Sequence, residues 1–171
     1  MKVICDADGL IKMAKAGILD IFARHVEVLV SPQVYREAVE DGKARGYPDA
    51  VEIERVLERH GHRVQPPKRR RTNLRVDIVS LGAGEQEILQ VLSQERADVV
   101  LSDDRAFLSI LETLGISYMT PGAALLFLVE QNAIQVQEAQ QALEQLRSLI
   151  RHEQYEAVFQ DLQGFQERSR R

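Results

Sequence analysis

One short apolar run near the amino terminus, residues 3–5, constrains the fold most because it ends directly in an acid. A strand without a polar interruption is expected to be covered on both faces, as in parallel α/β sheets. Asp6 then lies at the strand end, where open parallel sheets bind ligands. A carboxylate there needs a hydrogen bond, a counter-charge or a metal ion. Asp6 or Asp8 could equally cap the following helix, so this stretch alone leaves both interpretations open.

Similar apolar runs recur along the chain and alternate with segments of helical periodicity. Ser31-Pro32 and Thr120-Pro121 are typical helix starts, and Asp41-Gly42 is expected to end the helix that carries Glu37. Strands alternating with helices predict a three-layer α/β/α fold with a parallel sheet of four or five strands. The first strand is expected to be central, beside the strand at 99–101. The predicted strands cover residues 3–5, 26–30, 99–101 and 116–119, and residues 62–65 are a short candidate for a fifth.

The pattern changes near residue 135, after which two amphipathic helices follow with no strand between them. We therefore expect an α/β domain over residues 1–132 and a C-terminal helical extension over residues 133–171. Apolar stripes on both helices need cover, because soluble monomers rarely expose large hydrophobic patches. The extension is expected to pack on its own domain or at a dimer interface, and we expect a homodimer.

Bulk composition restricts the class of protein. The chain has 171 residues, 44% of them hydrophobic, which is enough for a sizeable core. A net charge of -4 argues against general attraction to nucleic acid, so a polyanion would need a local basic patch or bound metal ions. The single cysteine, Cys5, excludes an intramolecular disulfide. With no signal peptide and no apolar run long enough to cross a bilayer, we expect a soluble, cytoplasmic protein without membrane contact.

A second acidic strand end, Asp103-Asp104, follows the apolar run at 99–101. Neighbouring strand ends lie about 5 Å apart, so these acids and Asp6 could share one cation. Glu37 and Glu85 lie near helix starts on the same sheet edge. Oxygen ligands from separate segments suit Mg²⁺ or Mn²⁺, which would relieve carboxylate repulsion and activate water for phosphodiester hydrolysis. The predicted catalytic residues are Asp6, Glu37, Glu85 and Asp104, and the predicted metal ligands are Asp6, Glu85, Asp103 and Asp104.

Five segments in order carry a family resemblance: DADGLIKMAKAGILDIF, SPQVYREAV, GAGEQEIL, LSDDRAF and ISYMTPGAALLFLVE. Together they resemble the PIN domain, the nuclease fold of virulence-associated (VapC-type) toxins. The resemblance implies acids at Asp6, Glu37, Glu85 and Asp104. It also implies a metal-dependent ribonuclease that acts on RNA, often as a toxin neutralised by an antitoxin protein. Asp8 stands where these domains usually carry serine or threonine, which adds a negative charge to the site.

Basic residues could contribute RNA contacts. The run at 68–71 could hold RNA phosphates, but it is not interleaved with aromatic residues, so we favour an ordinary solvated loop. Arg105, next to Asp104, could approach a phosphate or pair with Asp103 or Glu85. The candidate RNA-binding residues are Lys68, Arg69, Arg70, Arg71 and Arg105.

Two alternatives remain open. The DADG sequence after a strand also opens haloacid-dehalogenase-like phosphatases, in which Asp6 would be the nucleophile and Asp8 the acid/base. That hypothesis gives Glu37 and Glu85 no role. The second alternative is a non-catalytic PIN-like scaffold that binds RNA or a protein through its helical tail.

Overall fold

The four strands form one parallel sheet in the computed structural model, which describes residues 1–60, 81–92 and 97–169. Strand β1 (Lys2–Cys5) lies between β2 (Glu27–Val30) and β3 (Val99–Leu101), and β4 (Tyr118–Met119) extends the sheet beyond β3. The strand order β2-β1-β3-β4 confirms the predicted parallel sheet with a central first strand beside 99–101. The candidate fifth strand at 62–65 lies outside the described residues.

The strand register aligns the carboxyl ends of the first three strands. Cys5 pairs with Val30 on one side and with Leu101 on the other. The next residues in the chain, Asp6 and Ser102 among them, therefore lie together at one sheet edge. Every apolar strand here delivers a polar residue to that edge, which positions the candidate site.

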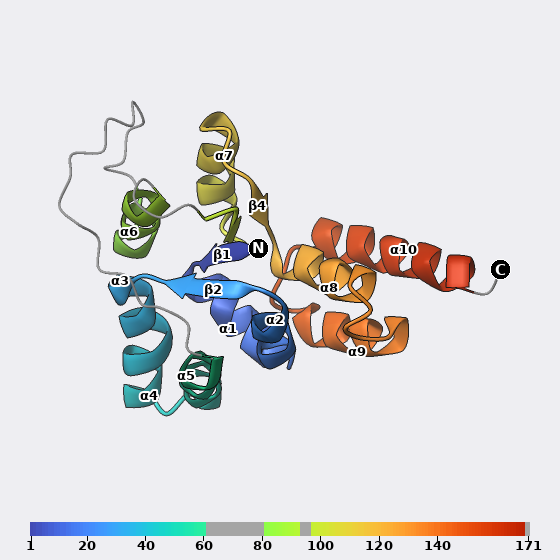
Figure 1. Ribbon diagram of the computed structural model, residues 1–171, viewed down its shortest axis with the longest axis horizontal. Helices are drawn as coiled ribbons and strands as arrows, with labels where there is room; N and C mark the ends of the chain where they lie inside the picture. Colours follow the sequence, from blue (N-terminus) through green and yellow to red (C-terminus); the bar gives the residue numbers. More distant parts are fainter. Residues whose placement is uncertain (61–80, 93–96, 170–171) are drawn as a thin grey trace.

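Helices lie on both sides of the sheet, giving the expected three-layer α/β/α arrangement (Figure 1). On one side are α1 (Ala7–Lys15), α2 (Leu19–His25) and α5 (Pro48–His60). On the other are α6 (Ala83–Leu92) and α7 (Arg105–Thr113).

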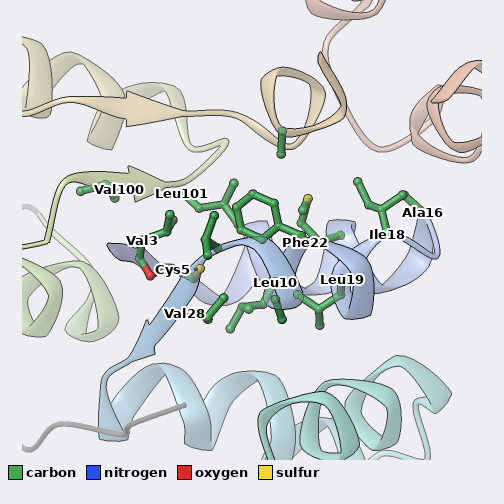
Figure 2. Packing of buried hydrophobic residues seen from close by; sticks show 14 of the residues in the cluster. Val3, Cys5, Leu10, Ala16, Ile18, Leu19, Phe22, Val28, Val100 and Leu101 are labelled. Atoms are coloured by element: carbon green, nitrogen blue, oxygen red, sulfur yellow. Dashed lines mark hydrogen bonds between the residues drawn. The ribbon is translucent and has the colours of Figure 1, made fainter. Parts of the chain in front are cut away.

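The core fills the space between the sheet and these helices. Val3, Leu10 and Phe22 are fully buried, and Figure 2 shows them among side chains from β2 and β3. The Phe22 ring also meets Phe127 of α8 (Pro121–Glu130) edge to face, with ring centroids 6.1 Å apart. This aromatic pair joins α8 to the helices that follow β1.

The helical segment after β2 is longer than expected. It runs through α3 (Pro32–Tyr35), the π-helical turn η1 (Arg36–Glu40) and α4 (Asp41–Ala44). The predicted end at Asp41-Gly42 is therefore wrong. A Cβ on Gly42 would lie 2.7 Å from the Ala50 Cβ, so this glycine permits close helix packing. Gly46, with φ of +77°, lies beyond the actual helix end.

The two C-terminal helices pack within the chain. Helix α9 (Val136–Leu146) lies against α8 and α1, and α10 (His152–Ser169) lies against α8 and α9. Leu143 and Leu146 are fully buried, so the apolar stripe is covered without a second chain. Its burial removes that stripe as an argument for a homodimer, which stays a prediction. In the described parts of the chain, no helix is long and apolar enough to cross a membrane.

Candidate functional site

A pocket of about 300 Å³ opens at the carboxyl edge of the sheet. Among the described residues, its polar lining is acidic, and no lysine or arginine contributes to it. The structure thus brings together all four predicted catalytic acids and adds Asp8. The lining residues are Asp6, Ala7, Asp8, Val34, Glu37, Gly82, Ala83, Gly84, Glu85 and Asp104.

Asp6 is the most enclosed of these acids, with 6% of its surface exposed. It caps α1, because its Oδ1 accepts a hydrogen bond from the backbone N–H of Gly9 at 2.5 Å. Its Oδ2 accepts a hydrogen bond from the Ser102 hydroxyl. Burial raises the pKa of Asp6 to about 7; those two hydrogen bonds oppose the rise, while Asp8 and Glu85 add to it. Asp6 is therefore the N-cap of α1 and also lines the acidic pocket.

Asp104 occupies the corresponding place after β3. Its Oδ1 accepts a hydrogen bond from the backbone N–H of Phe107 at 2.8 Å and so caps α7. The backbone N–H of Asp104 donates to the Ser102 hydroxyl oxygen at 3.2 Å. Ser102 is fully buried and links the two acidic strand ends. Sequence reasoning missed this serine, although its place directly after an apolar strand was a usable signal.

Glu37 reaches the pocket from the π-helical turn η1. The amide of Gln33 donates to its Oε1 at 2.7 Å, which fixes one side of the carboxylate. Its Oε2 faces α6, where a Cβ on Gly84 would come within 3.2 Å. Gly84 thus makes room for Glu37 between the two helices. π-Helical turns are rare and frequently occur at functional sites.

Glu85 comes from the first turn of α6. Its Oε2 accepts a hydrogen bond from the backbone N–H of Gly82 at 2.8 Å, which stabilises the helix start. Burial raises the pKa of Glu85, and Asp104 and Glu37 raise it further, whereas the Gly82 hydrogen bond lowers it. The four acids thus act on one another across the pocket.

The structure directs Asp103 away from the pocket, although it was predicted as a metal ligand. Its Oδ2 accepts from Lys12 Nζ at 2.6 Å, and its Oδ1 accepts from the Gln154 amide at 2.7 Å. Asp8 does line the pocket, but its Oδ2 also pairs with Lys12 Nζ at 2.6 Å. Two neighbouring acids, Asp103 and Asp104, therefore have different surroundings.

The candidate RNA-binding residues do not line the pocket in the described part of the chain. Arg105 is exposed in the first turn of α7, next to Asp104. Lys68, Arg69, Arg70 and Arg71 lie outside the described residues.

The donor chemistry of the pocket fits a hard divalent cation. Over residues 1–60, 81–92 and 97–169, no three histidine, cysteine, aspartate or glutamate side chains form a ready-made metal cluster. The acids instead line the pocket as separate oxygen donors whose charges oppose one another. Mg²⁺ and Mn²⁺ prefer oxygen ligands and commonly use few carboxylates together with water. The residues present therefore suit such an ion.

The fold and the site define a class: a three-layer α/β domain whose parallel sheet gathers acids from four separate segments into one pocket. A family model described as a PIN domain matches residues 2–163, and the chain belongs to this family. No curated protein and no solved structure gives a significant match.

Membership of this family gives the chain a nuclease-like fold. PIN domains are generally nucleases, typically use divalent metals and take nucleic acid as substrate. The family match does not support the phosphatase alternative, which also gave Glu37 and Glu85 no role in the pocket they line.

Proposed function

We propose that the protein is a Mg²⁺- or Mn²⁺-dependent endoribonuclease of the toxin–antitoxin type and that the acidic pocket is its active site. The observation that carries the proposal is the enclosed carboxylate of Asp6, which shares a pocket with four other acids. Concentrating like charges is unfavourable unless a cation compensates them. Membership of a nuclease family supports the same conclusion.

Asp6, Glu85 and Asp104 are the proposed metal ligands. They come from the end of β1, the start of α6 and the start of α7, and each also receives a backbone hydrogen bond that limits its motion. A bound divalent ion would lower the pKa of a water molecule and stabilise negative charge on the phosphate. We leave Asp103 out of the ligand set, because it does not line the pocket and its two oxygens accept from Lys12 and Gln154 instead.

Glu37 is proposed to position the attacking water and accept its proton at Oε2. Gln33 holds the other oxygen of this carboxylate, which leaves Oε2 on the side of α6 and the pocket. In the hydrolysis, the water oxygen forms a bond to phosphorus and the bond to the leaving oxygen breaks. The water proton passes to Glu37, and the leaving oxygen takes a proton from solvent.

The proposal is tested by incubating the protein with single-stranded RNA, with Mn²⁺ or with EDTA. We expect cleavage only with the metal, and we expect Asp6→Asn and Glu85→Gln to lose it while remaining folded. A loss of about 10³-fold corresponds to about 4 kcal/mol of barrier lowering. Asp161→Asn is the matched control, because Asp161 is exposed on α10. Full activity in EDTA would contradict the proposal, and metal-dependent RNA binding without cleavage would favour the non-catalytic scaffold.

The toxin role and an antitoxin partner are separate parts of the proposal. Expression of the wild-type chain in a bacterial host should arrest growth, and expression of Asp6→Asn at the same level should not. If the two strains grow equally while the protein cleaves RNA in vitro, the nuclease activity is supported and the toxin role is contradicted.

The proposed RNA contacts are tested by Arg70→Ala and Arg105→Ala. Loss of a phosphate contact should weaken RNA binding and reduce its salt dependence. Unchanged binding at every salt concentration would remove the altered residue from the RNA interface.

A further inference from the structure

A half-buried lysine, Lys12, connects the pocket to the C-terminal helix. Lys12 Nζ lies 2.6 Å from Asp8 Oδ2 and 2.6 Å from Asp103 Oδ2. The second oxygen of Asp103 accepts from the amide of Gln154, on α10, at 2.7 Å. These four side chains therefore form a continuous polar path from the pocket wall to α10.

The charged side chains of this path differ in their burial. The Asp103 side chain is 3% exposed and the Lys12 side chain 13%, whereas the Asp8 side chain is 53% exposed. A buried carboxylate such as Asp103 needs its partners, because an unpaired charge in that environment is strongly unfavourable. Lys12 is thus held mainly by Asp103, and its ammonium group has hydrogen-bond donors left for Asp8.

Asp8 lines the same pocket as Asp6, yet its carboxylate is paired with the ammonium group of Lys12. One turn of α1 separates Asp8 from Lys12, and this spacing places the two side chains on one helix face. An acid in this position could otherwise join the ligands of a divalent ion, since it lies only two residues beyond Asp6.

We propose that Lys12 is a positioning residue that keeps Asp8 out of the metal ligand set, and that α10 fixes Lys12 through Asp103 and Gln154. This inference rests on the proposed metal site. It gives the C-terminal helix a part in the site although none of the pocket acids comes from that helix.

The first test measures Mn²⁺ affinity by calorimetry and does not depend on RNA cleavage. The double variant Lys12→Met/Asp103→Asn removes one positive and one negative charge together, so the net charge near the pocket is unchanged. Asp8 is then free to join the ligands, and an additional carboxylate should tighten Mn²⁺ binding about tenfold, a free-energy change of about 1.4 kcal/mol. Lys15→Met is the matched control, because Lys15 is an exposed lysine in the last turn of the same helix. This variant is expected to leave the affinity unchanged.

Adding Asp8→Asn identifies the source of the change. In the double-variant background, Asp8→Asn should abolish the tighter binding, whereas in the wild-type background it should weaken Mn²⁺ binding much less. Equal effects of Asp8→Asn in both backgrounds, or weaker binding by the double variant, would overturn the role of Lys12. Because the double variant removes the buried carboxylate together with its partner, it avoids the unfolding expected from Lys12→Met alone.

The second test separates the polar path from the metal site. Urea unfolding in EDTA is measured for Lys12→Arg, Gln154→Leu and the combined variant. Both substitutions act on Asp103, so the effects on the unfolding equilibrium constant should depart from additivity by about twofold or more. Additive effects would overturn the link to α10. If the effects on unfolding are non-additive but the protein binds no Mn²⁺, the polar path to α10 is supported and the proposed metal site is contradicted.

Discussion

Replacing Asp6 with asparagine separates the cost of the buried charge from the role of the carboxylate as a ligand. In the metal-free protein, burial raises the pKa of Asp6 from 3.8 to about 7. Between these values the folded protein keeps a proton that the unfolded chain has lost. The free energy of unfolding therefore falls as the pH rises from about 4 to about 7. The pKa difference of roughly three units corresponds to about 4 kcal/mol.

Asparagine removes this cost but disturbs one hydrogen bond. Its carbonyl oxygen can still accept from the Gly9 N–H, while its NH₂ group replaces the oxygen that accepts from Ser102. A lost or reversed hydrogen bond costs about 1 kcal/mol. At pH 8, Asp6→Asn should therefore be about 3 kcal/mol more stable than the wild type, and at pH 4 about 1 kcal/mol less stable.

Urea unfolding in EDTA at pH 4 and pH 8 measures both differences. The change of sign is the diagnostic result, because simple damage to the pocket would destabilise the variant at both pH values. Asp161→Asn, at an exposed position, should differ from the wild type by less than about 0.5 kcal/mol at either pH. A stability difference that does not vary with pH would refute the argument from burial.

Three further predictions follow from the geometry of the pocket and the tail. Because Asp6 must lose its proton to bind a cation, Mn²⁺ affinity should fall about tenfold per pH unit below about 7, and a flat calorimetric profile from pH 5.5 to 8 would contradict this. Gly84→Ala places a Cβ 3.2 Å from Glu37 Oε2 and 3.3 Å from Val34 Cγ2, so it should displace the Glu37 carboxylate and slow RNA cleavage about tenfold. Gly164→Ala, with open space at its Cβ, is the control and should cleave at the wild-type rate. Truncation after Asn132 removes the fully buried Leu143 and Leu146, each worth about 1.5–3 kcal/mol of burial, so the shortened chain should unfold at lower urea or lose solubility. A truncated chain of wild-type stability would show that the tail is dispensable for folding.

The features predicted correctly from the sequence are those encoded locally. The uninterrupted run at 3–5 predicted a central buried strand, and Ser31-Pro32 predicted the start of α3. Both signals rest on residues adjacent in the chain, where strand burial and helix capping act. The approach of the acids to one edge also followed, because parallel strands align their carboxyl ends.

Contacts between distant residues account for the features that were missed. Asp103 and Asp104 are equivalent in sequence terms, and what distinguishes them is the placement of Lys12 and Gln154, which lie 91 and 51 residues away from Asp103. Gly42 resembles a helix terminator, but its role depends on Ala50 of the neighbouring helix. Local sequence patterns do not encode these contacts between distant residues.

The π-helical turn η1 sets the rotational phase of the helical segment that contains it. A π turn holds one more residue than an α turn, and each residue of an α-helix advances the side-chain direction by about 100°. Glu37 lies in this turn and faces the pocket, while Gly42 lies beyond it and faces α5. If η1 became α-helical through the loss of one residue, the directions of Glu37 and Gly42 would change relative to each other by about 100°. Deletions in this turn should therefore be tolerated less well than substitutions, since the pocket and the α5 contact could not both be kept.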